Sequence, residues 1–403
     1  MADNLTILLT LTSALLVIYH HLGYPLILRH LSRRKEMPVV DYTPRHHSRQ
    51  AGDRHLPTIT LVIPAYNEQQ HIADKVRNLA ALDYPADRLR VIIACDGCND
   101  ATAQLAQQCA EEPECRHLDI EVRGFSQNRG KVAVINDVIG SIESSLVALS
   151  DVSALISVDA LLVAANHFST HSVGVVCGRY QLLNPGSEGE AVYWRYQSRI
   201  KAGEAALGAP LGAHGAFYMF RRKLFTPLPA DTINDDFILP MQIVARGRHA
   251  IYEPAINALE LEQADSNLDQ QRRRRIAAGN LQQLIRLWGM LRPKHKGVAF
   301  AFASGKALRV LMPLLLLITL FGSLWLAQDY RLFQVMALTQ VLIYTLAVGY
   351  HFGHGNMTNK LLDTLDYLVS GHLAGLIGSW NYLTGHHRRP WQRVGIEREE
   401  QRS

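Results

Sequence analysis

The N-terminal part of the chain contains a long stretch without a charged side chain. Residues Leu5 to Leu28 include no Asp, Glu, Lys or Arg. A helix crosses the bilayer core with about 20 predominantly apolar residues, so this stretch is long enough to span a membrane. A cleaved signal peptide has a basic start and a shorter apolar run, whereas this chain starts with Met1, Ala2 and Asp3. A buried helix of a globular protein is the alternative, and the length favours a transmembrane helix.

Two further apolar runs lie near the C-terminus. Ala307 to Ala327 and Leu332 to Tyr350 are joined by the short sequence "QDYR", which predicts a helical hairpin that crosses the membrane twice. Residues 361–384 are also apolar, but Asp363 and Asp366 interrupt them. Because a carboxylate inside the bilayer is costly, we expect a helix that lies on the membrane surface there.

Basic residues set the orientation of these segments. Arg29, Arg33, Arg34 and Lys35 directly follow the first apolar run. The positive-inside rule therefore places the N-terminus outside and the middle of the chain in the cytoplasm. The net charge of +5 comes largely from such clusters, which suits an anionic membrane surface better than nucleic acid.

The middle of the chain, from about residue 56 to 278, has the pattern of a water-soluble α/β domain. The apolar runs "TITLVIPAYNE" and "LRVIIACDG" predict buried strands, and a helical pattern from Gln69 to Ala81 lies between them. The alternation continues through a strand near 118–122, a helix from Lys131 and the strand "SLVALSD". This rhythm predicts a sheet with buried parallel strands.

Polar residues follow the predicted strands at their carboxyl ends, where open α/β sheets bind ligands. They are Tyr66, Asn67, Glu68, Asp96 and Asp151. Asp96 and its neighbours are also ordinary turn residues, which is the alternative reading. With Arg129 and Lys131 of "NRGK" nearby, such an edge is suited to a nucleotide base, its ribose and a metal-bound diphosphate, because magnesium prefers one or two carboxylates plus phosphate oxygens.

A second acidic feature is the pair Asp235 and Asp236 in "DTINDDFILP", at the start of an apolar helical pattern. Carboxylates are favourable at a helix N-terminus whatever the protein does. The residues alone leave open whether this pair caps the helix or takes part in catalysis.

The five cysteines all lie in the predicted cytoplasmic domain, where disulfides rarely persist, so we expect free thiols. Cys95 and Cys98 form a C-x-x-C motif. No second Cys or His pair at zinc spacing follows it, which argues against a metal or redox role.

Six motifs, in order along the chain, resemble the family 2 membrane glycosyltransferases, the group of the bacterial cellulose, chitin-oligosaccharide, hyaluronan and poly-N-acetylglucosamine synthases. They are "VIPAYNE", "CDGCNDAT", "NRGK", "SDVSA", "INDDF" and "RRRRIAAGN". The resemblance implies an α/β nucleotide-diphosphosugar transferase domain of the GT-A type, with transmembrane and interfacial helices. It also implies inverting transfer of a sugar from a nucleotide donor to an acceptor hydroxyl.

The resemblance assigns the donor site residue by residue. Tyr66 and Glu68 would contact the nucleoside, Asp96 the uracil or ribose, and Lys131 the nucleotide sugar. Asp151 stands at the first position of the family's D-x-D metal motif, which implies Mg²⁺ or Mn²⁺. Ser153 replaces the second aspartate, so Asp151 would provide most of the protein's metal coordination.

"INDDF" occupies the place of the family's T-E-D motif. By this resemblance Asp236 is the catalytic base and Asp235 the counterpart of the preceding glutamate. One carboxylate is enough, because the acceptor hydroxyl must lose its proton as it attacks, whereas the leaving diphosphate needs positive charge.

Three further assignments follow from the resemblance. "RRRRIAAGN" aligns with Q-x-x-R-W, the family's acceptor and diphosphate motif, so that Arg272 replaces the Gln, Arg275 keeps the arginine and Ile276 replaces the Trp. Both arginines would bind the nucleotide sugar, with Arg275 favoured at the diphosphate; lipid phosphates are the alternative partners of Arg273 and Arg274. His214 in "LGAHGAFYMF" either contacts the acceptor or only fills its position. Trp391 in "HHRRPWQR" would reach over the nucleotide, as in a gating loop.

These expectations divide the chain into six parts. They are an N-terminal transmembrane helix with its basic flank (1–35), a linker (36–56), a cytoplasmic glycosyltransferase domain (57–279), amphipathic interfacial helices (280–306), two transmembrane helices (307–352), and an interfacial helix with a basic Trp-containing loop (353–403).

The expected function is processive synthesis of a polysaccharide from a nucleotide-diphosphosugar, coupled to export, in the bacterial inner membrane. The expected acceptor is a glycan or a lipid-linked acceptor. Three spans are few for a pore, so a homo-oligomer or an export partner subunit would be needed to complete one. A single-transfer enzyme that glycosylates a membrane lipid, and a catalytically inactive subunit, are the alternatives.

Overall fold

The computed structural model describes residues 2–33, 45–186, 188–262, 266–353 and 359–386. The chain forms two compact units. One contains residues 1–34, 185–200 and 265–387 and is helical; the other contains residues 35–184, 201–264 and 388–403 and holds the sheet.

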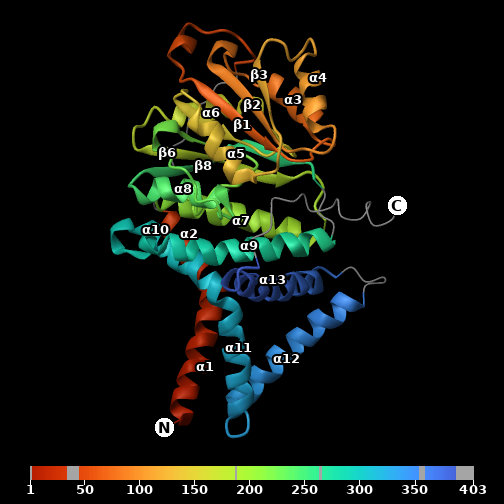
Figure 1. The fold of residues 1–403 in the computed structure, drawn as a ribbon. Coiled ribbons are helices and arrows are strands. Elements are labelled where there is room, and N and C mark those ends of the chain that lie inside the picture. Colours follow the sequence, from red (N-terminus) through yellow and green to blue (C-terminus); the bar gives the residue numbers. More distant parts are fainter. Residues whose placement is uncertain (1, 34–44, 187, 263–265, 354–358, 387–403) are drawn as a thin grey trace, which may run out of the picture. The chain divides into compact units, whose positions relative to one another are not determined.

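Within the described residues the sheet has eight strands in the order β3-β2-β1-β4-β7-β6-β8-β5. Figure 1 labels β1, β2, β3, β6 and β8. The strands β1, β2, β3 and β4 are parallel to one another, β7 runs antiparallel to both β4 and β6, and β5 runs antiparallel to β8. The strands are β1 (Ile59–Ala65), β2 (Leu89–Asp96), β3 (Asp119–Phe125), β4 (Leu146–Leu149), β5 (Ala154–Ile156), β6 (Val173–Leu182), β7 (Tyr218–Arg221) and β8 (His249–Glu260).

The predicted parallel strands correspond to the first half of this sheet. All residues of β1 are buried, as are all but one of β2, which explains why both read as continuous apolar runs. The antiparallel pairing of β7 and β5 was not predicted, because a short apolar run does not indicate the direction in which its strand pairs.

Helices pack around the sheet. α5 packs against β1, α4 against β3, α6 and α8 against β6 and β8, and α3 against β5 and α4. The helices of this unit are α3 (Ile72–Ala80), α4 (Thr102–Ala110), α5 (Lys131–Gly140), α6 (Ala160–His167) and α8 (Asp235–Ala245), with short 3₁₀ turns η2 (Ala51–His55), η3 (Ala86–Arg88) and η4 (Arg222–Leu224). The helix α7 (Glu188–Ala206) contributes its C-terminal turns.

Among the described residues of the helical unit, three segments are long and apolar enough to cross a membrane: Asp3–Ser32, Gly297–Leu326 and Arg331–Phe352. They correspond to the three predicted spans. Its elements are α1 (Ala2–Ile18), η1 (Tyr19–Gly23), α2 (Tyr24–Ser32), α9 (Ser266–Arg286), η5 (Trp288–Leu291), η6 (Pro293–His295), α10 (Gly297–Ala301), η7 (Phe302–Ala307), α11 (Leu308–Leu326), α12 (Arg331–Phe352) and α13 (Lys360–Leu383).

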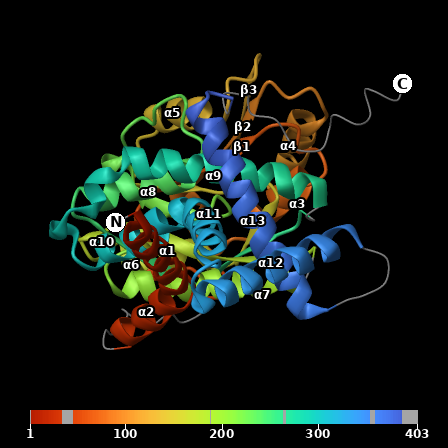
Figure 2. The ribbon, with the colours of Figure 1, turned by 90° about the horizontal axis from the view of Figure 1, so that it is seen from below.

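Close helix contacts hold this unit together (Figure 2). α1 lies along α11, where a Cβ at Gly322 would come within 2.0 Å of the Thr10 hydroxyl oxygen. α9 lies along α13, where a Cβ at Gly378 would come within 2.4 Å of the Arg274 carbonyl oxygen. Glycine at positions 322 and 378 lets each pair of helices approach more closely than any side chain would permit.

Candidate active site

The loop after β2 is fixed by a buried carboxylate. Asp96 is 0% exposed, and its Oδ2 accepts hydrogen bonds from the backbone N–H groups of Arg129 and Gly130 at 2.9 and 2.8 Å. These groups immediately precede α5, so Asp96 sets the position of Lys131 at the start of that helix. The other oxygen, Oδ1, is buried and lies 3.9 Å from Arg129 Nε, but it accepts no hydrogen bond from the part of the chain that the structure describes.

Gly97 is required at this turn. Its φ is +62°, and a Cβ there would lie 2.3 Å from the backbone nitrogen of Asn128. The loops after β2 and β3 therefore approach each other at a distance that only glycine permits.

The loop after β1 is tied to the loop after β2. Asn67 adopts a left-handed conformation with φ 53°, and its Oδ1 accepts the N–H of Asn99 at 2.9 Å. The N–H of Glu68 donates to the Thr102 hydroxyl at 2.7 Å. Tyr66 is half-buried beside them. Tyr66, Glu68 and Asp96 thus lie on adjacent, interlocked loops at one edge of the sheet.

A lysine and two aspartates form the centre of the site. Lys131 Nζ lies 2.7 Å from Asp151 Oδ1 and 3.7 Å from Asp235 Oδ2. Asp151 follows β4 and its N–H donates to the carbonyl of Gly215 at 3.0 Å. A Cβ at Gly215 would lie 2.5 Å from Asp151 Oδ2, so glycine leaves the space that this carboxylate occupies.

The charges in this cluster change one another's ionisation. Burial alone would lower the pKa of Lys131, but the carboxylates of Asp151 and Asp235 outweigh it and raise the pKa. Burial alone would raise the pKa of Asp151, but the charge and hydrogen bond of Lys131 lower it. Both side chains are therefore charged near pH 7.

Asp236 has the opposite behaviour. Burial and the neighbouring charge of Asp235 raise its pKa to about 6. Its carbonyl accepts the N–H of Ala213 at 2.9 Å, which joins the first turn of α8 to the loop that carries His214. A carboxylate with this pKa is ionised at neutral pH and basic enough to accept a proton.

Asp235 begins α8 and Asn234 precedes it at the cap position. The Asp235 side chain is directed to Lys131 at 3.7 Å. Asp235 thus contacts the cationic centre, while the part of the pair in catalysis stays a prediction.

Side chains of α7 hold the loop that carries His214. Lys201 Nζ donates to the carbonyl of Gly212 at 2.7 Å, and Glu204 Oε2 accepts the N–H of Leu211 at 2.9 Å. The His214 ring stacks on Tyr180, with ring centroids 3.7 Å apart, and its Nδ1 accepts the N–H of Ala216. The residues on either side of His214, Ala213 and Gly215, are hydrogen-bonded to the backbone of Asp236 and Asp151, while the role of His214 at the acceptor stays a prediction.

The residues at the predicted metal position supply one carboxylate. Asp151 has two oxygens near the cluster centre, and Ser153 is 9% exposed with its carbonyl bonded to the N–H of Leu261. Within the described residues no set of three or more His, Cys, Asp or Glu side chains is arranged to hold a metal by itself. This arrangement still fits Mg²⁺ or Mn²⁺, because such an ion at a phosphate site needs only one or two carboxylates besides phosphate oxygens and water.

Lys75 is a site residue that the sequence analysis missed. It is 0% exposed, and its Nζ donates to Ser150 Oγ at 2.6 Å and to the carbonyl of Ala154. Burial lowers its pKa to about 7, although the charges of Asp151 and Glu260 act in the other direction. The sequence carries a signal for it, because Lys75 lies on the apolar face of α3 with Ile72, Val76 and Leu79.

The remaining predicted residues belong to the helical unit or fall outside the described part of the chain. Arg272 and Arg275 are in α9 of the helical unit, and their contact with a diphosphate stays a prediction. Trp391 lies outside the described residues. All five cysteines are free thiols, as expected.

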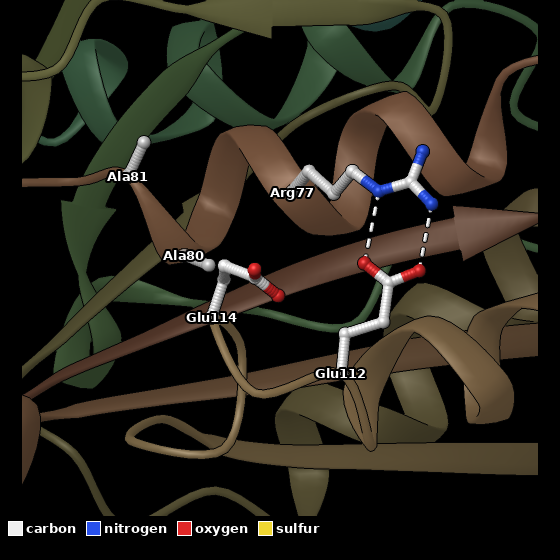
Figure 3. A pocket seen from close by; sticks show the side chains of 5 residues that line it. All are labelled: Arg77, Ala80, Ala81, Glu112 and Glu114. Carbon is white, nitrogen blue, oxygen red and sulfur yellow. Dashed lines mark hydrogen bonds and ion pairs between the residues drawn. The ribbon is translucent and has the colours of Figure 1, made fainter.

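The unit that holds the sheet also has a surface pocket. It is lined by Arg77, Ala80, Ala81, Glu112 and Glu114, and the Arg77 guanidinium pairs with both carboxylate oxygens of Glu112 (Figure 3). None of the predicted site residues lines it.

Comparison with known proteins identifies the class. Residues 57–279 match the family "Glycosyltransferase like family 2". The match covers more than half of the chain, so this chain belongs to that family and is a glycosyltransferase.

The individual relatives are more distant. The chain is 27% identical over 207 residues to a poly-β-1,6-N-acetyl-D-glucosamine synthase of Staphylococcus aureus (strain COL), over 49% of this chain and 48% of the relative. It is 25% identical over 268 residues to a β-monoglucosyldiacylglycerol synthase of Trichormus variabilis, over 64% of this chain and 56% of the relative. The chain thus spans about half the length of the curated relatives it matches.

A solved structure agrees on the fold. The mannosyltransferase PcManGT from Pyrobaculum calidifontis, in complex with GDP-Man and Mn²⁺, superposes with a TM-score of 0.67 at 20% identity, over 91% of this chain and 99% of that one. The predicted GT-A type fold is therefore confirmed.

Proposed function

We propose that this protein is a membrane-embedded inverting glycosyltransferase that transfers a hexose or N-acetylhexosamine from a UDP-sugar to a growing polysaccharide. The observation that carries the proposal is the cluster of Lys131, Asp151, Asp235 and Asp236 at one edge of the sheet, with Asp96 on the adjoining loop. A cation for the diphosphate and a carboxylate of raised pKa for the acceptor are the two groups that the chemistry needs.

The nucleoside would bind between the loops after β1 and β2. The buried Oδ1 of Asp96 is an acceptor for an N–H or O–H of the base or ribose. A buried acceptor without a donor costs free energy, of order 1–3 kcal/mol, and a bound nucleoside would remove that cost. Tyr66 and Glu68, on the loop that is hydrogen-bonded to the loop after β2, are proposed to complete this contact.

The diphosphate would lie against Lys131 and Asp151. Lys131 is kept charged by its carboxylate partners, so it is able to exchange the 2.7 Å contact with Asp151 for phosphate oxygens. A Mg²⁺ or Mn²⁺ ion, held by Asp151 with Ser153 beside it, would neutralise charge that develops on the leaving diphosphate. Arg272 and Arg275 are proposed to add guanidinium contacts.

The reaction is a single displacement. The acceptor hydroxyl oxygen forms a bond to the anomeric carbon, the bond from that carbon to the diphosphate oxygen breaks, and the hydroxyl proton passes to Asp236. The diphosphate leaves with the electron pair. Asp235 raises the pKa of its neighbour and pairs with Lys131, and His214 is placed to orient the acceptor.

The membrane part of the proposal rests on three candidate spans and on the basic residues that follow the first of them. With these residues inside, the catalytic unit faces the cytoplasm of a bacterial cell. α13 is not among the candidate spans and is proposed to lie at the interface. Processive elongation coupled to export through an oligomer or with a partner subunit is the finer form of the proposal, supported by the relative that is named for polymer synthesis.

A single transfer to a membrane lipid is the second candidate. Ile276 replaces the Trp on which an acceptor sugar would stack, and one relative is named for a glycosylated diacylglycerol. An inactive subunit is the third, since Ser153 weakens the metal motif. The intact pair of Asp235 and Asp236 beside Lys131 argues against it.

One experiment separates these candidates. The purified protein in lipid nanodiscs is incubated with UDP-glucose, UDP-N-acetylglucosamine or GDP-mannose, with and without Mg²⁺ or Mn²⁺, and nucleotide release and product length are measured. The proposal expects metal-stimulated UDP release and a polymer. A product with one sugar on a lipid would select the second candidate, and no release with any donor would select the third.

A further inference from the structure

Two π-helical turns interrupt the candidate membrane spans of the helical unit. One is η1 (Tyr19–Gly23), between α1 and α2, and the other is η7 (Phe302–Ala307), just before α11. π-Helical turns are rare in proteins, and those that occur are often found at functional sites. In this protein they pack against each other.

Side chains of the two turns are bonded directly. The Tyr19 hydroxyl and the Ser304 hydroxyl are 2.7 Å apart, and His20 Nδ1 lies 2.9 Å from the Ser304 carbonyl oxygen. Tyr24 lies over Gly305, where a Cβ would come within 3.0 Å of the tyrosine oxygen. The widened turns therefore bring polar groups together from positions far apart in the chain.

Three imidazoles and a guanidinium gather there. The ring centroids of His20 and His21 are 5.1 Å apart, and those of His21 and His372 are 5.5 Å apart. Arg309, on the first turn of α11, acts electrostatically on all three rings. We call these four side chains, with Tyr19 and Ser304, the imidazole cluster.

The chemistry of the imidazole cluster favours an anion. Its members are hydrogen-bond donors, and Arg309 is always charged. Burial, with the charges of His21 and Arg309, lowers the pKa of His372 to about 4, so at neutral pH this ring offers an N–H donor. A second cation, Lys306, lies on the same π-helical turn as Ser304 and donates to Asn280 at 2.8 Å.

The position of the cluster along the membrane normal indicates what kind of molecule would supply the anion. α1 has 17 residues before its π-helical turn and α11 has 19 residues after its own. At about 1.5 Å per residue these helices are roughly 26 and 28 Å long, close to the thickness of the hydrocarbon core, about 30 Å. We take α1 and α11 as the parts of the candidate spans Asp3–Ser32 and Gly297–Leu326 that cross the hydrocarbon core. On that assignment the cluster lies at the cytoplasmic ends of both helices, at the level of lipid headgroups.

We propose that the imidazole cluster binds the phosphate of a membrane lipid. The proposal rests on the membrane embedding of the proposed function and is independent of sugar transfer. Arg309 would pair with phosphate oxygens while the imidazole N–H groups donate to them. The lipid is either a bulk anionic phospholipid or a prenyl phosphate, since both present the same group.

Ligand binding to the purified full chain in dodecyl maltoside tests the site, because this detergent carries no phosphate. The probes are dioctanoyl phosphatidic acid, farnesyl phosphate, dioctanoylglycerol as the matched lipid without phosphate, and inorganic phosphate. Dissociation constants come from the ligand dependence of the unfolding temperature, with no sugar donor present. Asp236→Asn should bind like wild type, so failure here is distinguishable from failure of the transferase proposal.

The expected result is binding of at least one lipid phosphate, with dioctanoylglycerol and inorganic phosphate at least tenfold weaker. The tighter of the two lipid phosphates identifies the source. Arg309→Gln should weaken this binding about tenfold or more, the loss expected for one charge-assisted contact. The matched control is Arg331→Gln, which removes the same charge at the other end of the hairpin and should change binding less than twofold.

Equal binding of dioctanoylglycerol and phosphatidic acid, or equal losses in Arg309→Gln and Arg331→Gln, would overturn the proposal. Inorganic phosphate that binds as tightly as the lipids would overturn its lipid part. If Arg309→Gln does not fold, His21→Ala gives the same test from a partly exposed position, with the same tenfold expectation.

Discussion

The ammonium of Lys131 lies 2.7 Å from Asp151 Oδ1 and 3.7 Å from Asp235 Oδ2, so a single cation joins the predicted metal ligand to the predicted catalytic pair. In the absence of a donor, this lysine balances two carboxylates that would otherwise repel each other. A bound diphosphate would compete with both for it. Lys131 thus connects donor binding to the state of the catalytic carboxylates.

Replacing Lys131 tests this connection. Lys131→Met should lower the transfer rate by about 10²–10³-fold, because an electrostatic contact to the leaving diphosphate is lost. Lys131→Arg keeps the charge and should retain most of the donor affinity. Steady-state kinetics with varied UDP-sugar gives the transfer rate and the donor affinity. Equal transfer rates for Lys131→Met and the wild type would contradict the assigned role.

The pH dependence of transfer follows from Asp236. Its pKa of about 6 means that the base is protonated in acid and ionised near neutral pH. The rate should therefore rise as the pH increases through about 6 and level off above it. A rate profile from pH 5 to 8 under saturating donor checks this, and a profile that is flat across this range would exclude Asp236 as the group that accepts the proton.

The same raised pKa predicts a change in stability. The folded state holds the Asp236 proton more tightly than the unfolded chain, whose carboxyl has the ordinary pKa of 3.8. The folded state therefore loses stability as the pH rises from about 4 to 6. Asp236→Asn should raise the unfolding temperature at pH 7 by a few degrees and leave it unchanged below pH 4; a lower unfolding temperature at pH 7 would contradict the cause given for the shift.

Gly215 is predicted to be irreplaceable for a steric reason. Gly215→Ala would place a Cβ 2.5 Å from Asp151 Oδ2 and force the carboxylate away from Lys131. We expect a stability loss of about 1–3 kcal/mol and a larger loss of activity. The control is Gly124→Ala in β3, where a Cβ would meet nothing within 4 Å. This control substitution should change neither stability nor activity. Similar effects of both substitutions would argue that Asp151 is free to move.

Lys75 predicts a change of stability with pH that is opposite in sign to the change predicted for Asp236. Its folded-state pKa of about 7 is below the ordinary value of 10.5, so the unfolded chain binds more protons between these pH values. Stability from this group should rise from pH 7 to about 10. In Lys75→Met this rise should disappear, as measured by unfolding temperatures across that range, and donor affinity should fall because Ser150 and Ala154 lose a common donor. An unchanged pH slope would mean that the pKa of Lys75 is not lowered in the folded state and that the ammonium stays charged there.

Much of the sheet edge was predictable because it depends on local sequence. The runs that became β1 and β2 are apolar on both faces, and this pattern places Tyr66, Glu68 and Asp96 at the carboxyl ends of neighbouring strands. Parallel pairing then brings their loops together whatever the rest of the fold. The candidate spans followed from length and charge alone.

Other features depend on contacts between distant segments. Nothing local to Lys75 indicates that its ammonium lies beneath the loop of Asp151, since the bonds to Ser150 and Ala154 are made across more than seventy residues. The direction of β7 and β5 is set by their partners. The packing of Tyr19 and His20 on Ser304 likewise needs two π-helical turns that the apolar pattern conceals.

The transfer rate of Asp236→Asn, measured together with its affinity for the UDP-sugar, tests the central claim most directly. The substitution keeps the shape of the side chain and removes the base. We predict a rate about 10²–10⁴-fold below wild type with donor affinity within a few-fold, as expected for loss of a general base. Transfer within twofold of wild type, at equal donor affinity, would contradict the account.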